Sequence, residues 1–155
     1  MVMGMAYCTV NEVLEMLKPG MMDVIVDDKY TDDFKDRIQA ITPLAEKAIE
    51  DAGAEIDGYL SKRYDVPFEN TPRVINKFCK DIALYNLVSR QGIDESDSEK
   101  TYLTRYNSAI SFLTKVASGV IEIGVGNNTT QHAAQTGFSM SSSGRIFSRD
   151  SMGGW

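Results

Sequence analysis

The sequence predicts a mainly α-helical protein, a small antiparallel bundle of about four helices with an extended C-terminal arm. Apolar residues recur at helical spacing in four separate stretches before residue 120. Helix-start and helix-stop residues bracket these stretches. Residues 126–144 are instead mostly Gly, Asn, Thr, Gln, Ser and Ala, and burial of so few apolar groups cannot offset the entropy of ordering. We therefore expect a helical domain over residues 1–125 and an arm over residues 126–155.

The first predicted helix is short and begins after Thr9. Thr9 and Glu12 have the spacing of a capping box, in which each side chain bonds a free amide of the first turn. Apolar residues follow at helical spacing, and Lys18-Pro19-Gly20 ends the helix.

Residues 18–41 are less clearly patterned. The apolar run at 21–26 could form a short strand or a covered loop, and Phe34, Ile38 and Ile41 could add a turn or two of helix. The aspartates between these groups indicate a solvated loop, because the turn glycine and distal glutamate of a calcium loop are missing. We regard this stretch as a second candidate contact surface.

The second predicted helix begins at Thr42-Pro43 and runs to about residue 62. Threonine is a good N-cap, and proline at the first helical position loses no hydrogen bond. The small residue Gly53 lies on the apolar side, where it would let a neighbouring helix approach closely.

The third predicted helix follows the same Thr-Pro device at Thr71-Pro72 and ends near Arg90. Its apolar residues cover more than one face, which is typical of the most buried helix of a bundle. In the connection before it, Pro67 favours an extended backbone at Val66.

The fourth predicted helix begins at a second capping box, Ser96 and Glu99, and stops at Gly119. Residues 120–125 alternate weakly in polarity and could form a short strand. A lone strand is only marginally stable, so it would need a partner edge.

Composition excludes several classes of protein. The net charge of −6 argues against a general nucleic-acid binder, although not against a wall past which DNA slides. The two cysteines, Cys8 and Cys79, form no CxxC motif, so we expect two buried thiols in a reducing compartment, with no metal and no redox use. No apolar run reaches the ~18 residues of a membrane span. Residues 1–5 lack the basic start of a signal peptide, so we expect a protein made in the cytosol.

No catalytic constellation is visible. His132 is the only histidine, and it lies in the polar stretch, away from any partner that could hold it. Cys79 falls on an apolar face, where an inert thiol is expected. Gly124-Val125-Gly126 is not followed by the helix and Lys-Ser/Thr of a phosphate-binding loop. We expect no enzyme activity, no catalytic residues and no cofactor.

Several segments together resemble one known family. Residues 54–64 contain the run IDGYL and end in Arg63-Tyr64, Pro67 follows, and residues 79–85 contain DIALY. This order is similar to that of the phage Mu gp36-like family, in which a helix ending in IDGYL leads through a loop to a helix containing DIA. The terminal residues 145–150 are similar to the Arg-x-Phe-Ser-Arg motif that closes the family pattern.

The resemblance implies a structural virion protein, a head–tail connector of a tailed phage or prophage. Such an adaptor would form a ring under the portal, extend the DNA channel and dock the next neck or tail protein. The implied partners are the portal protein, copies of the chain in a dodecameric ring that matches the portal, and a stopper or tail-completion protein. Genomic DNA would pass through the lumen without sequence-specific binding. The implied location is the neck of the virion, after assembly in the host cytoplasm.

We predict two groups of interface residues. The first lies at the end of the arm, where arginines and aromatic residues of the kind that anchor interfaces follow a polar segment: Arg145, Ile146, Phe147, Arg149 and Trp155. The alternative is a terminal segment folded back on its own bundle. The second group is Arg63 and Tyr64. For these two residues the alternative is intramolecular, with Tyr64 packed on the core and Arg63 covering the C-terminus of its helix, and it is at least as well supported as an interface role.

Two other functions stay open at this point. One is a small helical regulatory or binding protein of a phage, which would act as a monomer or dimer without needing a long arm. The other, within the same virion, is a tail-completion or stopper protein.

Overall fold

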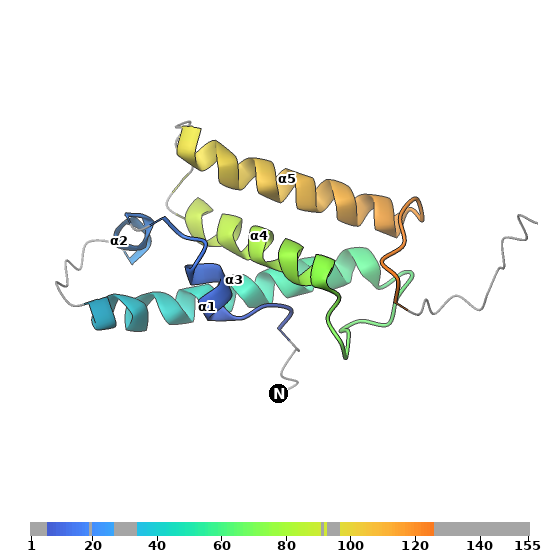
Figure 1. The fold of residues 1–155 in the computed structure, drawn as a ribbon, viewed down its shortest axis with the longest axis horizontal. Coiled ribbons are helices and arrows are strands. Elements are labelled where there is room, and N and C mark those ends of the chain that lie inside the picture. The colour runs from blue at the N-terminus through green and yellow to red at the C-terminus, as the bar shows by residue number, and fades with distance from the viewer. Residues whose placement is uncertain (1–5, 19, 27–33, 91, 93–96, 126–155) are drawn as a thin grey trace, which may run out of the picture.

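The computed structural model describes residues 6–18, 20–26, 34–90, 92 and 97–125. The described residues form five α-helices and no strand: α1 (Val10–Leu14), α2 (Met21–Val26), α3 (Phe34–Leu60), α4 (Arg73–Ser89) and α5 (Asp97–Ala117). The three long helices lie side by side in alternating directions, and the short α1 and α2 pack on α3 and α4 (Figure 1). The prediction of a mainly α, antiparallel bundle is confirmed.

Helix α1 begins as its capping box predicts. The amide of Glu12 donates to the Thr9 hydroxyl at 3.4 Å, and the Glu12 carboxylate accepts from the Thr9 amide at 2.8 Å. Val13 and Leu14 are buried on the inner side of this single turn. The capping box, which spans four residues, was enough to place this element, because its partners are neighbours in sequence.

Helix α2 corrects the expectation of a strand or loop at residues 21–26. Ile25 is buried, its neighbours Met21, Met22 and Val26 are half-buried, and Val24 is 51% exposed. A strand would place Val24 on the same face as Met22 and Val26, whereas a helix places it on the outer side. A short apolar run does not itself distinguish these two structures, and packing on α3 decides between them.

Helix α3 also departs from its predicted start at Thr42-Pro43. It begins eight residues earlier, at Phe34, and continues through Pro43. Proline inside a helix costs about 3 kcal/mol, while full burial of a single isoleucine such as Ile41 contributes about 1.5–3 kcal/mol. The ion pair between Arg37 and Asp23 of α2, at 2.9 Å, lies on the same added turns. Thr42 does not cap, because its hydroxyl donates to the Ile38 carbonyl at 2.6 Å.

Helix α4 is the most enclosed of the long helices, as predicted. Its buried residues lie on more than one face, in contact with α3 on one side and α5 on the other: Ile75, Phe78, Cys79, Asp81, Ile82, Ala83, Leu84, Leu87 and Val88. The expected threonine cap is absent, because Pro72 occupies the N-cap position with extended backbone and no side-chain bond. The helix therefore begins at Arg73, just after proline rather than at it.

Gly53 has a different neighbour from the one predicted. A Cβ atom at this position would lie 4.0 Å from the ring of Tyr7, so the N-terminal segment, and not another long helix, covers this point of α3. We call residues 6–9 the N-terminal segment.

Helix α5 ends at the predicted glycine. Gly119 has φ of +86°, the Val120 amide donates to the Lys115 carbonyl at 2.9 Å, and the Gly119 amide donates to the Val116 carbonyl at 3.0 Å. These two bonds form the Schellman arrangement that closes helices at a left-handed glycine. The predicted capping residue Ser96 lies outside the described residues.

The residues after α5 form no strand. Residues 118–125, which we call the exit segment, turn back along the end of the bundle next to the end of α3 (Figure 1). Among the described residues no segment offers the strand edge that their weak alternation would need, so the prediction of a strand at 120–125 is wrong. The arm at 126–155 lies outside the described residues.

Candidate assembly surfaces

Arg63, which follows α3, contacts the last turn of α5 and the start of the exit segment. Its Nη1 donates to the carbonyl oxygen of Val116 at 3.0 Å, and its Nη2 lies 3.8 Å from Glu122 Oε1. The guanidinium passes so close to Gly119 that a Cβ atom there would lie 3.1 Å from Nη1. A cation at the C-terminal end of a helix is favourable, because the last carbonyls carry partial negative charge. Arg63 therefore joins the end of α3 to the end of α5.

Tyr64 supports the same segment from inside the bundle. Its side chain is only 1% exposed, and its ring meets Phe68 edge-on, with the ring centres 6.1 Å apart. The amide of Ile123 donates to the Tyr64 hydroxyl at 3.3 Å. Arg63 and Tyr64 thus determine where the chain leaves the bundle toward residue 126.

Two of the predicted interface residues, Arg63 and Tyr64, lie among the described residues, and the terminal group does not. Arg63 and Tyr64 make the intramolecular contacts that the sequence left open as the alternative, and any role for them at an interface stays a prediction. The terminal group lies outside the described residues: Arg145, Ile146, Phe147, Arg149 and Trp155.

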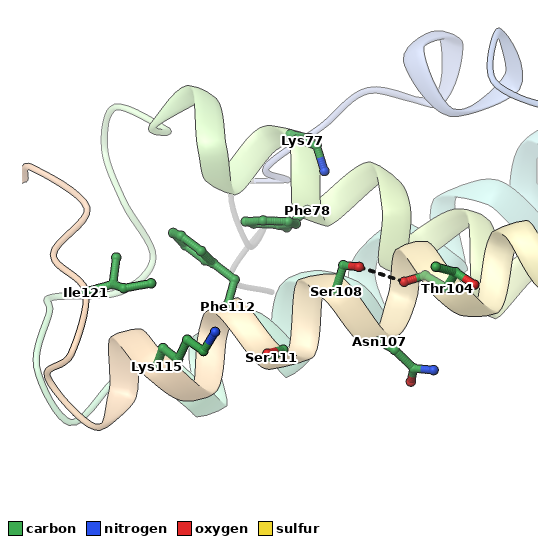
Figure 2. A pocket seen from close by; sticks show the side chains of 9 residues that line it. All are labelled: Lys77, Phe78, Thr104, Asn107, Ser108, Ser111, Phe112, Lys115 and Ile121. Atoms are coloured by element: carbon green, nitrogen blue, oxygen red, sulfur yellow. Dashed lines mark hydrogen bonds between the residues drawn. The ribbon is translucent and has the colours of Figure 1, made fainter.

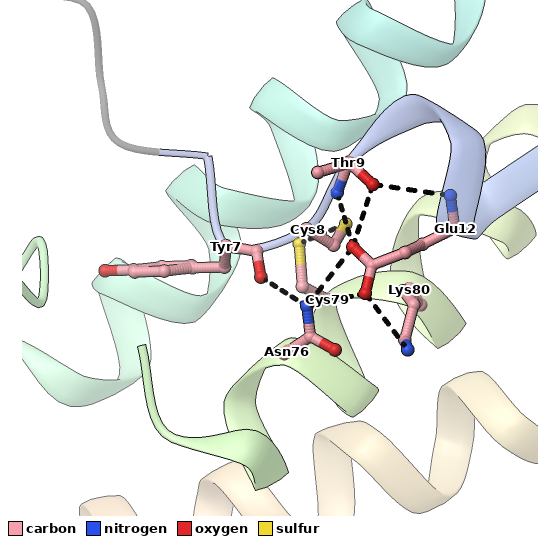
Figure 3. Close-up of polar contacts among 7 residues, drawn as sticks. All are labelled: Tyr7, Cys8, Thr9, Glu12, Asn76, Cys79 and Lys80. Carbon is pink, nitrogen blue, oxygen red and sulfur yellow. Dashed lines mark hydrogen bonds and ion pairs between the residues drawn. The ribbon is translucent and has the colours of Figure 1, made fainter. Parts of the chain in front are cut away.

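A polar cluster attaches the N-terminal end of the described chain to α4 (Figure 3). Asn76 of α4 donates to the carbonyl oxygen of Tyr7 at 2.9 Å, and Lys80 lies 3.6 Å from Glu12. The hydrogen bond from the Thr9 amide holds the pKa of Glu12 below its usual value. These contacts join the N-terminal segment and α1 to α4.

Tyr7 also joins the N-terminal segment to α3. Its side chain is 2% exposed, its hydroxyl donates to Asp57, and it accepts from the Phe68 amide at 3.3 Å. Burial raises the pKa of the Tyr7 phenol well above its usual value. Burial also raises the pKa of Asp57, against the lowering effect of the Tyr7 hydrogen bond.

An open groove of about 660 Å³ lies between α4 and α5, near the exit segment (Figure 2). Two rings, Phe78 and Phe112, meet in it with their centres 4.7 Å apart. Lys77 lies over the Phe78 ring at 4.4 Å and also pairs with the buried Asp81 at 2.8 Å. The other residues that line the groove are Thr104, Asn107, Ser108, Ser111, Lys115 and Ile121.

The lining of the groove is better suited to binding a protein segment than to acid–base catalysis. The hydroxyls of Thr104 and Ser108 donate to carbonyls of their own helix, at 2.8 and 2.9 Å. The lining residues include no carboxylate, histidine or thiol that could act as a base beside these hydroxyls. The lining offers two aromatic rings, the Lys77 ammonium over one of them, and a second ammonium from Lys115. These groups suit an acidic or aromatic segment.

Sequence reasoning missed this groove. The polar residues at 104, 108, 111 and 115 do repeat at helical spacing, which marks a single stripe on α5. That stripe could have been found in the sequence. Its position opposite Phe78 depends on how α4 and α5 pack, which no local pattern specifies.

In the described part of the chain, no group of three or more His, Cys, Asp or Glu side chains is arranged to hold a metal ion. None of the helices in that part combines the length and hydropathy needed to cross a membrane.

Comparison with known proteins gives one family. Residues 7–142 match the model of the family described as Bacteriophage Mu, Gp36. The match covers the whole described bundle from Tyr7 onward, and it ends before the terminal motif at 145–150.

Two relatives agree with this result. The Mu-like prophage FluMu protein gp36 of Haemophilus influenzae is 33% identical over 110 residues, which are 71% of this chain and 74% of the relative. Gene product J of Escherichia phage Mu is 28% identical over 125 residues, which are 81% of both chains. The chain belongs to the phage Mu Gp36 family, and this membership points to a structural or morphogenetic protein of a phage.

Proposed function

We propose that this protein is a head–tail connector, a non-catalytic neck subunit that forms a ring under the portal of a tailed phage. The ring would extend the DNA channel and dock the next neck protein, a stopper or tail-completion protein. The observation that carries the proposal is the family match over residues 7–142, which spans the whole described bundle.

The shape of the described bundle supports this role. Three long helices pack through a continuous apolar core, which gives a rigid body of the kind that a ring subunit needs. A ring of identical subunits uses heterologous contacts that close, so one surface of the body must match a different surface of its neighbour. The groove between α4 and α5 is one candidate for such a surface.

The chain beyond residue 125 supports the same role through its composition. A polar segment that orders only on its partner loses conformational entropy once, when the assembly forms. The arginines and aromatic residues at 145–155 are of the type that carry interface energy. The net charge of −6 suits a channel wall along which DNA passes without adhering.

Native mass spectrometry tests the proposal directly. The purified full chain is measured alone and then mixed with the portal ring of the phage or prophage that encodes it. We expect discrete addition of one copy per portal subunit. A monomer or dimer that never joins the portal would contradict the proposal and favour a regulatory protein or a stopper that binds another adaptor.

A deletion of residues 127–155 then separates arm from body. If the arm carries the contact, the shortened chain melts at the temperature of the full chain and no longer joins the portal. If the shortened chain melts earlier but still joins the portal, the terminal residues fold on their own bundle and the interface assignment is wrong.

A further inference from the structure

Two thiols meet between the N-terminal segment and α4. Cys8 lies just before α1, Cys79 lies in the middle of α4, and their Sγ atoms are 3.1 Å apart (Figure 3). Both are free thiols, and their side chains are 4% and 0% exposed. The two residues are 71 positions apart in sequence, so the fold alone creates this pair.

The surroundings keep the two sulfur atoms together. The backbone on one side of Cys8 is tied to α4, because Asn76 donates to the Tyr7 carbonyl at 2.9 Å. On the other side, Thr9 is tied to Glu12 through the capping box. Cys79 sits one helical turn after Asn76, so the same turn of α4 holds both the backbone and the sulfur of the N-terminal segment.

We propose that Cys8 and Cys79 form an oxidation site, which closes to an intramolecular disulfide when the protein meets a low-molecular-weight disulfide such as oxidised glutathione. The site needs no third protein group, because thiol–disulfide exchange requires only an attacking thiolate and a sulfur within reach.

The exchange takes place in two steps. The Cys8 thiolate attacks one sulfur of oxidised glutathione, the S–S bond of glutathione breaks, and one reduced glutathione leaves. Cys79 then loses its proton to solvent and attacks the Cys8 sulfur, and the second reduced glutathione leaves. Two thiol protons and two electrons have passed from the protein to one molecule of oxidised glutathione, which becomes two molecules of reduced glutathione.

Cys8 is the entry point for the oxidant. Cys8 is 4% exposed and lies in the N-terminal segment, whereas Cys79 is 0% exposed and lies in the middle of α4. The hydrogen bond between the two thiols and burial both raise the pKa of Cys79, so Cys79 stays protonated at first.

The disulfide would fasten the N-terminal segment to α4 across a loop that contains α1, α2 and α3. A cross-link over a loop of this length restricts the unfolded chain strongly, and we expect the melting temperature to rise by about 10 °C. The thiol pair would therefore make the attachment of the N-terminal segment sensitive to reducing and oxidising surroundings.

The test is incubation of the purified full chain with oxidised glutathione, followed by intact mass measurement and melting. We expect a monomer that has lost two hydrogen atoms, a peptide that joins Cys8 to Cys79, and a raised melting temperature that dithiothreitol reverses. In Cys79→Ser, one glutathione should remain attached at Cys8. Cys8→Ser should stay unmodified while folded, because Cys79 is enclosed.

Three results would overturn the proposal. One is a wild-type protein whose two thiols both still react with iodoacetamide after the incubation is stopped and the chain is unfolded. The second is a disulfide between two chains, and the third is a stable glutathione adduct in the wild type. Unfolding in urea before oxidation provides the control, since both single variants should then accept glutathione equally.

Discussion

The two ends of the described chain are attached to the same bundle in different ways. The N-terminal segment inserts buried side chains, Tyr7 and Cys8, which are 2% and 4% exposed. The exit segment is less buried: Val120 is 74% exposed, Ile121, Ile123 and Val125 are only partly buried, and the Ile123 amide donates to the Tyr64 hydroxyl. A segment whose own side chains are buried contributes to the core. A segment with few buried side chains opens locally with a smaller free energy. The comparison therefore assigns stability to the N-terminal segment and adaptability to the exit segment.

Removal of the Tyr7 side chain should have the largest effect. Tyr7→Ala leaves a cavity beside Phe68, whose ring centre lies 5.9 Å from that of Tyr7, and it leaves Asp57 without its hydroxyl partner. We expect a loss of about 3–5 kcal/mol in the free energy of unfolding. Urea denaturation measures this loss. A loss below about 1 kcal/mol would contradict the conclusion that the N-terminal segment is part of the core.

A matched pair of hydroxyl deletions compares the two ends directly. Tyr7→Phe leaves both Asp57 and the buried Phe68 amide unpaired, and we expect a loss of about 2–3 kcal/mol. Tyr64→Phe affects only the Ile123 amide, and we expect about 0.5–1.5 kcal/mol. Both are measured by urea denaturation under the same conditions. Equal losses would show that the two attachments do not differ in strength.

The cation at the exit segment should contribute less. Arg63→Met keeps the apolar stem but removes the hydrogen bond to the Val116 carbonyl, and we expect a loss of about 1 kcal/mol. Its ion pair with the exposed Glu122, at 3.8 Å, adds little. Lys62→Met is the matched control, because Lys62 is an exposed neighbouring cation. If both variants melt alike, the bond from Arg63 to the end of α5 does not stabilise the fold.

The smallest effect concerns pH at the N-terminal end. The pKa of Glu12 is lower in the folded chain than in the unfolded chain, so its contribution is present above the ordinary glutamate pKa and is lost as pH falls through the folded value. Glu12→Gln should therefore lose less stability than the wild type between neutral pH and about pH 3. We expect a difference under ~1 kcal/mol, because the carboxylate is partly exposed.

Thermal melting at a series of pH values measures the difference between these two proteins. Asp57 has a raised pKa, so its effect on stability has the opposite sign, but it is present in both proteins and cancels in the comparison. Parallel pH profiles for the wild type and Glu12→Gln would contradict the role assigned to Glu12.

The elements that the sequence predicted correctly depend on neighbouring residues. The box of Thr9 and Glu12 and the stop at Gly119 each involve bonds within a few positions, and both lie where they were expected. The continuous burial of α4 was also visible as apolar residues on more than one face.

The errors arose where distant packing overrides a local signal. Thr42-Pro43 is a good start signal, yet burial of Ile41 and the contact of α2 carry α3 across it. The apolar run at 21–26 was ambiguous until α3 covered one side of it. The hydrogen bond from Arg63 to Val116 and the thiol pair join residues more than 50 positions apart. No pattern within one helix could have predicted them.

The contrast between the two ends is tested most directly by hydrogen exchange on the full chain, alone and mixed with the portal ring that the proposed function names as its partner. Alone, amides of the exit segment should exchange faster than those of α1, because their attachment opens at lower cost. Portal binding should then protect the exit segment and residues beyond 125, and leave α1 unchanged. If protection appears at α1 first, or nowhere after residue 118, the assignment of stability to one end and assembly to the other is wrong.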